Sequence, residues 1–148
     1  MKDLLKRIIV VGVFVAIGGF LLIQLVPYGR DHSNPPVVGE PNWDSPQTRE
    51  LAQRACFACH SNETVWPWYS NIAPVSWLVQ HDTDEGRRHL NFSTWGSGGQ
   101  GREPGEATEV IAEGNMPPPA YMMINSQARL TPAEKQALAE GLRATIYQ

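Results

Sequence analysis

The sequence predicts an all-α protein, in which a helical domain follows a single N-terminal transmembrane helix. An apolar run of 19 residues, from Ile8 to Val26, is long enough to span the roughly 30 Å hydrocarbon core of a bilayer. Further along, Ser45 and Thr131 are each followed directly by a proline, which is typical of a helix N-cap and first helical position. No stretch shows the strict alternation of apolar and polar residues that indicates a strand.

The N-terminal apolar run is predicted to be an uncleaved membrane anchor, residues 1–26. A cleaved signal peptide would have a shorter apolar region of about 7–15 residues and a cleavage site with small residues. The apolar run here is longer than that, and Val26 to Arg30 is a poor cleavage site. Lys2, Lys6 and Arg7 precede the run, so we expect a cytoplasmic N-terminus in the cytoplasmic membrane. The rest of the chain would then be periplasmic or extracellular.

Two further segments follow the anchor. Between Pro27 and Pro46 the chain has five prolines and no apolar period, which predicts a semi-extended, fairly stiff tether over residues 27–45. Trp43 is expected to be the first residue to dock on the domain. Residues 46–148 have a length that suits one domain.

The domain is predicted to contain short helices. In the last of them, which starts at Thr131, the residues Leu138, Leu142 and Ile146 form one apolar stripe. This stripe should pack on the first predicted helix, which starts at Pro46. Gly141 lies beside this stripe and costs about 1 kcal/mol relative to alanine, which a close helix crossing would explain. The expected helices are Pro46 to Ala55 or Cys56, Pro74 to Gln80, a separate one starting at Asp82, Glu106 to Glu113, and a final one from Thr131 to about Tyr147.

The sequence Cys56-Phe57-Ala58-Cys59-His60 is the attachment pattern of a c-type haem. On one helical turn both thiols face the same way and can form thioethers with the two vinyl groups of one porphyrin. The imidazole of His60 then falls at the iron as the proximal ligand. The chain has only these two cysteines. We therefore expect one covalently attached haem c.

Other interpretations of the two cysteines are a redox-active disulfide pair, a zinc site and a chance match. A redox pair is more typical beside a βαβ pattern, which this chain lacks. A zinc site needs four ligands, and no second pair of cysteines follows.

Several side chains could provide the second axial ligand to the iron. Met116 is favoured because it follows a short helix and a glycine and precedes three prolines, whose stiff backbone could hold its sulfur in place. His81 and His89 are alternatives, as is an open or water-filled site. Met122 and Met123 are expected to be core residues, and His32 has little to position it.

Trp66, Trp68 and Tyr69 follow the haem motif closely. Flat aromatic rings can cover a porphyrin edge and exclude water. These three residues are therefore predicted to shape the haem pocket, although filling a protein core is the general role of buried aromatic residues.

The charge of the chain restricts its partners. Without the N-terminal charges, nine basic residues remain against fourteen acidic ones. A basic surface for nucleic acid is therefore not expected. The acidic charge could favour a partly basic redox partner, or it could serve solubility alone.

At these residues the chain resembles two groups of proteins. Its layout is similar to class I cytochromes c, with a helix leading into CxxCH, a later Met-Pro loop and a C-terminal helix. More closely, residues 45–148 resemble the bacterial haem-binding domain family of small, often membrane-anchored monohaem proteins. The residues that carry this resemblance are Cys56-Phe57-Ala58-Cys59-His60-Ser61-Asn62, Trp66 through Pro74, Trp77 through His81, Glu85-Gly86-Arg87, Asn91-Phe92-Ser93, Met116-Pro117-Pro118, Tyr121 and Leu130-Thr131.

The resemblance implies a cytochrome-c-like α fold with covalent haem. Members of the family often carry His-Pro shortly after the tyrosine, where this chain has Asn125-Ser126. This chain therefore has no histidine there that could contact the iron or a propionate. That absence agrees with Met116 as the distal ligand.

The function expected from these features is single-electron transfer outside the cytoplasmic membrane, as a shuttle or as a subunit of a respiratory or photosynthetic complex. Its partners would be redox proteins or a membrane electron-transport complex. An enzyme is not expected, because acid and base residues do not form a convincing group. The alternatives are a haem-based sensor or small-ligand-binding protein with an open sixth site, and a peroxidase-like enzyme using His81 or His89.

Overall fold

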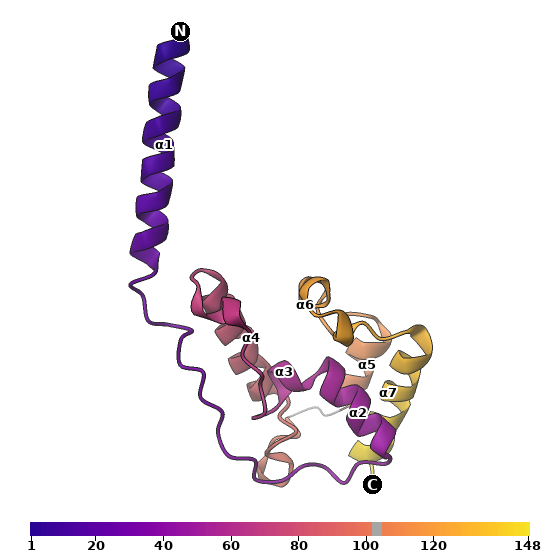
Figure 1. Cartoon of the computed structure of the whole chain (residues 1–148). Coiled ribbons are helices and arrows are strands. Elements are labelled where there is room, and N and C mark those ends of the chain that lie inside the picture. Colours follow the sequence, from indigo (N-terminus) through magenta and orange to yellow (C-terminus); the bar gives the residue numbers. More distant parts are fainter. Residues whose placement is uncertain (102–104) are drawn as a thin grey trace. The chain divides into compact units, whose positions relative to one another are not determined.

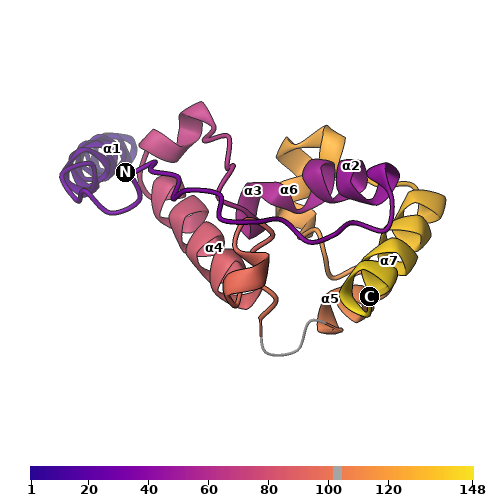
Figure 2. The same ribbon diagram turned by 90° about the horizontal axis from the view of Figure 1, so that it is seen from below.

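The computed structural model describes residues 1–101 and 105–148, and in this part of the chain it is all-helical. Apart from one isolated bridge between Gly39 and Thr94, the described residues form no β-structure (Figures 1 and 2). The all-α prediction is confirmed. The α-helices are α1 (Lys2–Ile23), α2 (Pro46–Ala55), α3 (Phe57–His60), α4 (Val75–His89), α5 (Glu106–Ala112), α6 (Pro119–Ile124) and α7 (Pro132–Ile146), with 3-10 helices at Trp68–Asn71, Trp95–Ser97 and Ser126–Ala128.

The chain forms two units, each made of two stretches. The first unit combines Met1–His32 with Trp66–His81, and the second combines Ser33–Val65 with Asp82–Gln148. Helix α4 begins in the first unit and ends in the second. The segment boundaries expected from the sequence, 1–26, 27–45 and 46–148, stay a prediction.

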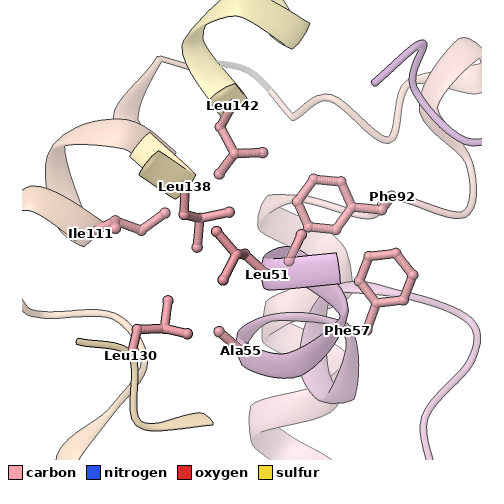
Figure 3. Close-up of a cluster of buried hydrophobic side chains, with 9 residues drawn as sticks. Leu51, Ala55, Phe57, Phe92, Ile111, Leu130, Leu138 and Leu142 are labelled. Carbon is pink, nitrogen blue, oxygen red and sulfur yellow. The ribbon is translucent and has the colours of Figure 1, made fainter. Parts of the chain in front are cut away.

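The hydrophobic core of the second unit is formed by α2, α3, α5 and α7 together with two residues from loops. Figure 3 shows Leu51, Leu138 and Leu142 converging from α2 and α7. Burial of such side chains stabilises a fold by about 1.5–3 kcal/mol each. The complete cluster is Leu51, Ala52, Ala55, Phe57, Phe92, Ile111, Leu130, Leu138 and Leu142.

Helices α2 and α7 cross closely at Gly141, as the sequence predicts. A Cβ atom at Gly141 would lie only 2.0 Å from Oγ1 of Thr48 on α2. Both residues are buried. The glycine therefore allows the two helices to approach, and this contact outweighs its cost in helix propensity.

The predicted ends of α2, α5 and α7 agree with the structure to within about a residue. Both N-caps are formed: Ser45 Oγ accepts from the Thr48 amide (3.2 Å), and Thr131 with Glu134 forms a capping box.

Two expectations about helices were wrong. The separate helices expected on either side of His81 are one helix, α4, because no proline or glycine interrupts the chain between Gln80 and Asp82. Helix α6 was not predicted, because its six residues are too few to show a period.

In the first unit, the C-terminal end of α1 is joined to the Trp66–His81 stretch. The side-chain amide of Gln24 donates to the carbonyl of Ala73 (2.9 Å) and accepts from its N–H (3.0 Å). His32 stacks on Trp66, with ring centroids 4.7 Å apart, and its Nε2 lies 3.1 Å from the carbonyl oxygen of Ser70.

Part of the predicted tether is hydrogen-bonded to the second unit. The amides of Val38 and Gly39 donate to the Ser93 carbonyl, at 2.8 and 3.1 Å. Glu40 forms a two-point ion pair with Arg49 on α2. Trp43 docks on the core cluster, as expected, with its ring centroid 5.1 Å from that of Phe92. Residues 38–43 are therefore bonded to, or packed on, other residues of the second unit.

Replacing Gly141 by alanine should destabilise the second unit by about 1–3 kcal/mol, because the new methyl group would overlap with Thr48. Urea unfolding of the full chain in detergent measures this loss. Gly96→Ala is the matched control, since no atom lies within 4 Å of a Cβ placed there. Adding Thr48→Ala should recover part of the loss, and equal losses with and without Thr48 would contradict the crossing.

The capping box predicts a pH-dependent contribution of Glu134. The backbone amide of Thr131 and the guanidinium of Arg54 lower the pKa of this carboxyl to about 2. Because the pKa in the unfolded chain is higher, about 4.3, the stabilisation is present above that value and is lost as the pH falls toward 2.

Glu134→Gln should therefore lower the thermal unfolding midpoint near neutral pH, and the difference from the wild-type protein should shrink as the pH falls through about 4 to 2. Glu140→Gln, on an exposed position of the same helix, is the control. A difference that is equally large at both ends of this pH range would contradict the role of the carboxylate.

Candidate haem site

The two cysteines and the histidine of the motif line one cavity in the second unit. Cys56 ends α2 and precedes α3, and its carbonyl accepts from the amides of Cys59 (3.1 Å) and His60 (2.9 Å). This tight turn brings both thiols and the imidazole to a cavity of about 490 Å³. That volume lies within the range of roughly 300–1,000 Å³ that is typical of small-molecule sites.

Both thiols are free and protonated at neutral pH. Burial raises the pKa of Cys56 to about 12 and that of Cys59 to about 11. No group of three or more His, Cys, Asp or Glu side chains that could hold a metal ion is found in the described part of the chain. The cysteines are two neutral thiols beside a mostly apolar cavity.

The imidazole of His60 is oriented by a backbone carbonyl. Its Nδ1 lies 3.0 Å from the carbonyl oxygen of Leu90, and a carbonyl can only accept. Nδ1 therefore carries the proton, and the lone pair of the neutral ring is on Nε2. Burial lowers the pKa of His60, which favours the neutral form. A neutral imidazole with its other nitrogen hydrogen-bonded is the usual state of a histidine that binds a metal.

The backbone around His60 is held by the residues that follow Leu90. The amide of Phe92 donates to the His60 carbonyl (2.8 Å), and Ser93 Oγ accepts from the amide of Asn62 (2.8 Å). Asn91 donates to the side chain of Asn62 (2.9 Å) and accepts from the Ser93 amide (2.9 Å). These buried hydrogen bonds fix both the ring and the main chain of His60.

Helix α4 contacts the motif through Gly86 and Arg87. A Cβ at Gly86 would lie 2.5 Å from the Cys59 carbonyl oxygen and 2.9 Å from the Cys59 Cβ. The absence of a side chain therefore allows α4 to pack directly on α3. Arg87 donates to the Ser61 carbonyl (2.8 Å) and to Thr64 Oγ1 (3.0 Å), so it holds the loop after His60.

The C-terminal half of the chain supplies much of the remaining wall. Met116 lines the cavity and is 38% exposed. Its amide and that of Asn115 both donate to the Val110 carbonyl at the end of α5, at 3.1 and 2.9 Å. These bonds fix the backbone from which the thioether projects. Other apolar lining residues from this half are Leu90, Phe92, Ala107, Val110, Ile111, Pro117, Pro118, Tyr121, Leu138 and Leu142.

Of the three histidines other than His60, one lines the cavity and two belong to the first unit. His89 lines the cavity, whereas His32 and His81 belong to the first unit. Met123, expected in the core, is 78% exposed. The expectation for Met123 is wrong because α6 is a short surface helix with no buried residue.

Trp66, Trp68 and Tyr69 also belong to the first unit. Their role in shaping the haem pocket stays a prediction.

The residues around the cavity suit a haem. Two neutral thiols and an imidazole whose Nδ1 is bonded to a carbonyl lie at one wall, apolar side chains form much of the rest, and a thioether lines the same cavity. Cys56, Cys59 and His60 would hold the group. Neither the role of the Leu90 carbonyl in orienting His60 nor the contact of Gly86 with Cys59 was predicted from the sequence. Gly86 is one of the residues that carry the family resemblance, but the resemblance does not explain its role.

Gly86→Ala should reduce the haem bound per polypeptide several-fold, because the methyl group would displace Cys59 and the turn that aims His60. The ratio of Soret absorbance to protein concentration measures this loss. Gly39→Ala is the control, since a Cβ there meets no atom within 4 Å. Full haem content in the Gly86 variant would contradict the positioning role.

Comparison with known proteins agrees with this site. The family model described as "Haem-binding domain" matches residues 18–144, which is most of the chain and includes the whole cavity wall. No curated protein and no solved structure matches the chain. The chain therefore belongs to the haem-binding domain family, and it is an all-α haem protein.

Proposed function

We propose that this haem protein is a membrane-anchored monohaem c-type cytochrome that carries single electrons on the outer face of the cytoplasmic membrane. One observation carries the proposal: Cys56, Cys59 and His60 line the same cavity, and Nδ1 of His60 is held by the Leu90 carbonyl. A cavity for haem held without covalent bonds would not require two thiols beside the proximal imidazole.

The thiols would form the covalent link. Each S–H group would add across one vinyl double bond of a haem, with the sulfur on one carbon and the hydrogen on the other. Because the two residues lie on one turn with His60, attachment would also fix the distance between the porphyrin and the imidazole.

Met116 is the proposed distal ligand. Its backbone is fixed to the end of α5, and its side chain lines the cavity. When bound, the haem iron would supply a one-electron redox centre. A His/Met ligand pair raises the reduction potential and leaves no open coordination site, which suits electron transfer better than ligand binding.

The proposed location follows from α1. Its 22 residues are long and apolar enough to cross a membrane. Lys2, Lys6 and Arg7 favour a cytoplasmic N-terminus, which would leave the haem domain periplasmic or extracellular. The partners would then be redox proteins or a membrane electron-transport complex, and nucleic acid is not expected.

Mass spectrometry of the denatured protein tests the covalent link. The wild-type polypeptide should carry the added mass of one haem, and Cys56→Ala or Cys59→Ala should each retain it through the remaining thioether. The double variant should lose it. Release of haem from the denatured wild-type chain would show that the group is bound without covalent bonds.

Met116→Ala should remove the weak red charge-transfer band of the oxidised protein, because this band reports sulfur bound to the iron. Met123→Ala is the matched control, since that side chain projects from the surface. An unchanged band in the Met116 variant would assign the iron-bound sulfur to another methionine. Absence of the band from the wild-type protein would instead assign the distal position to a group without sulfur, and His89 is such a residue that lines the cavity.

A further inference from the structure

The stretch Trp66–Gln80, named here the interfacial segment, has an unusual composition. It contains no Asp, Glu, Lys or Arg, although 18% of the chain is charged. It contains three of the five tryptophans, together with Tyr69. A surface stretch without charges and rich in aromatic residues indicates contact with something other than water.

Apolar side chains of the interfacial segment are exposed. Trp68 is 76% exposed and Leu78 is 56% exposed, and Ile72 and Val75 are also exposed. Val75 and Leu78 lie three residues apart in the first turns of α4, so they share one face of the helix.

The interfacial segment is fixed to the end of the membrane-spanning helix. Gln24, the C-cap of α1, makes two hydrogen bonds to the backbone of Ala73 at 2.9 and 3.0 Å. Gly29 lies against the Ser76 carbonyl, with space for no side chain, since a Cβ would be 2.3 Å from that oxygen. The segment is therefore held beside the last turn of α1, within one unit of the fold.

The length of α1 indicates the depth at which this junction lies. Its 22 residues extend roughly 33 Å, which matches the bilayer core and places Gln24 at the membrane–water boundary. Tryptophan and tyrosine are enriched at this depth, where an apolar ring meets lipid and its polar edge meets water. Arg30 donates to Gln24 (3.3 Å), so a cation lies beside this junction.

We propose that the interfacial segment lies in the headgroup region of the outer leaflet, with Trp68 and Leu78 in contact with phospholipid. This inference rests on the proposed function in one respect, namely that α1 spans the membrane. The occupant of the exposed apolar surface is the bilayer itself, because the hydrogen bonds to Gln24 make the segment continuous with the lipid-facing surface of α1. The protein would then contact the membrane through two elements.

Photo-crosslinking of the full-length holoprotein tests this inference. The protein is placed in nanodiscs of phosphatidylcholine and phosphatidylglycerol, and p-benzoylphenylalanine replaces one residue at a time. The positions are Trp68 and Leu78 in the interfacial segment, Leu22 in α1, and Tyr147 in the second unit. Tyr147 is the matched control, because it is an exposed aromatic residue outside this segment. Intact-protein mass spectrometry counts the lipid adducts.

Lipid adducts at positions 22, 68 and 78, several-fold more frequent than at position 147, are expected. Adducts at position 22, with 68 and 78 no higher than 147, would overturn the inference while leaving the membrane anchor intact. An absence of adducts at position 22 would overturn the anchor and, with it, the inference.

A second measurement separates lipid contact from haem contact. Leu78→Ser should leave the absorption spectrum of the bound haem unchanged and should reduce crosslinking from position 68 several-fold, because Leu78 is an exposed residue of the same segment. Crosslinking from position 68 that stays at the level of the wild-type protein, or a shifted Soret band in this variant, would overturn the inference.

Discussion

The hydrogen bond from His60 Nδ1 to the Leu90 carbonyl is the interaction on which the site depends. It selects the tautomer whose Nε2 can bind iron, and it requires residues 90–93 to run beside residues 60–62. The backbone bond from Phe92 to His60 and the bonds among Asn62, Asn91 and Ser93 maintain that arrangement. Phe92 also belongs to the hydrophobic core, so the packing of α2 and α7 is coupled directly to the orientation of the His60 imidazole.

Glycine provides the second constraint, because two helix contacts require the absence of a side chain. Gly86 brings α4 onto the Cys59 turn, and Gly141 brings α7 onto α2. The first contact sets the position of a thiol, and the second closes the core that forms part of the cavity wall. Both glycines lie in helices, where their intrinsic propensity is unfavourable, so their presence reflects packing.

Much of the fold was predictable because its signals are local. The Ser45 and Thr131 caps, the stripe containing Leu138 and Leu142, and Gly141 all act within a few residues of the helices they define. The Leu90 carbonyl was not predictable, because a backbone acceptor has no sequence signature and lies 30 residues from its donor. The joining of Gln24 to Ala73, 49 residues apart, was missed for the same reason.

The central claim is that His60 and Met116 occupy both axial positions of one covalently held haem, and the most direct test is the absorption spectrum of the reduced protein with and without carbon monoxide. Our account predicts a low-spin spectrum that carbon monoxide does not change, because no coordination site is open. A spectrum that shifts on addition of carbon monoxide would contradict it and would indicate a displaceable sixth ligand, as in a haem-based sensor.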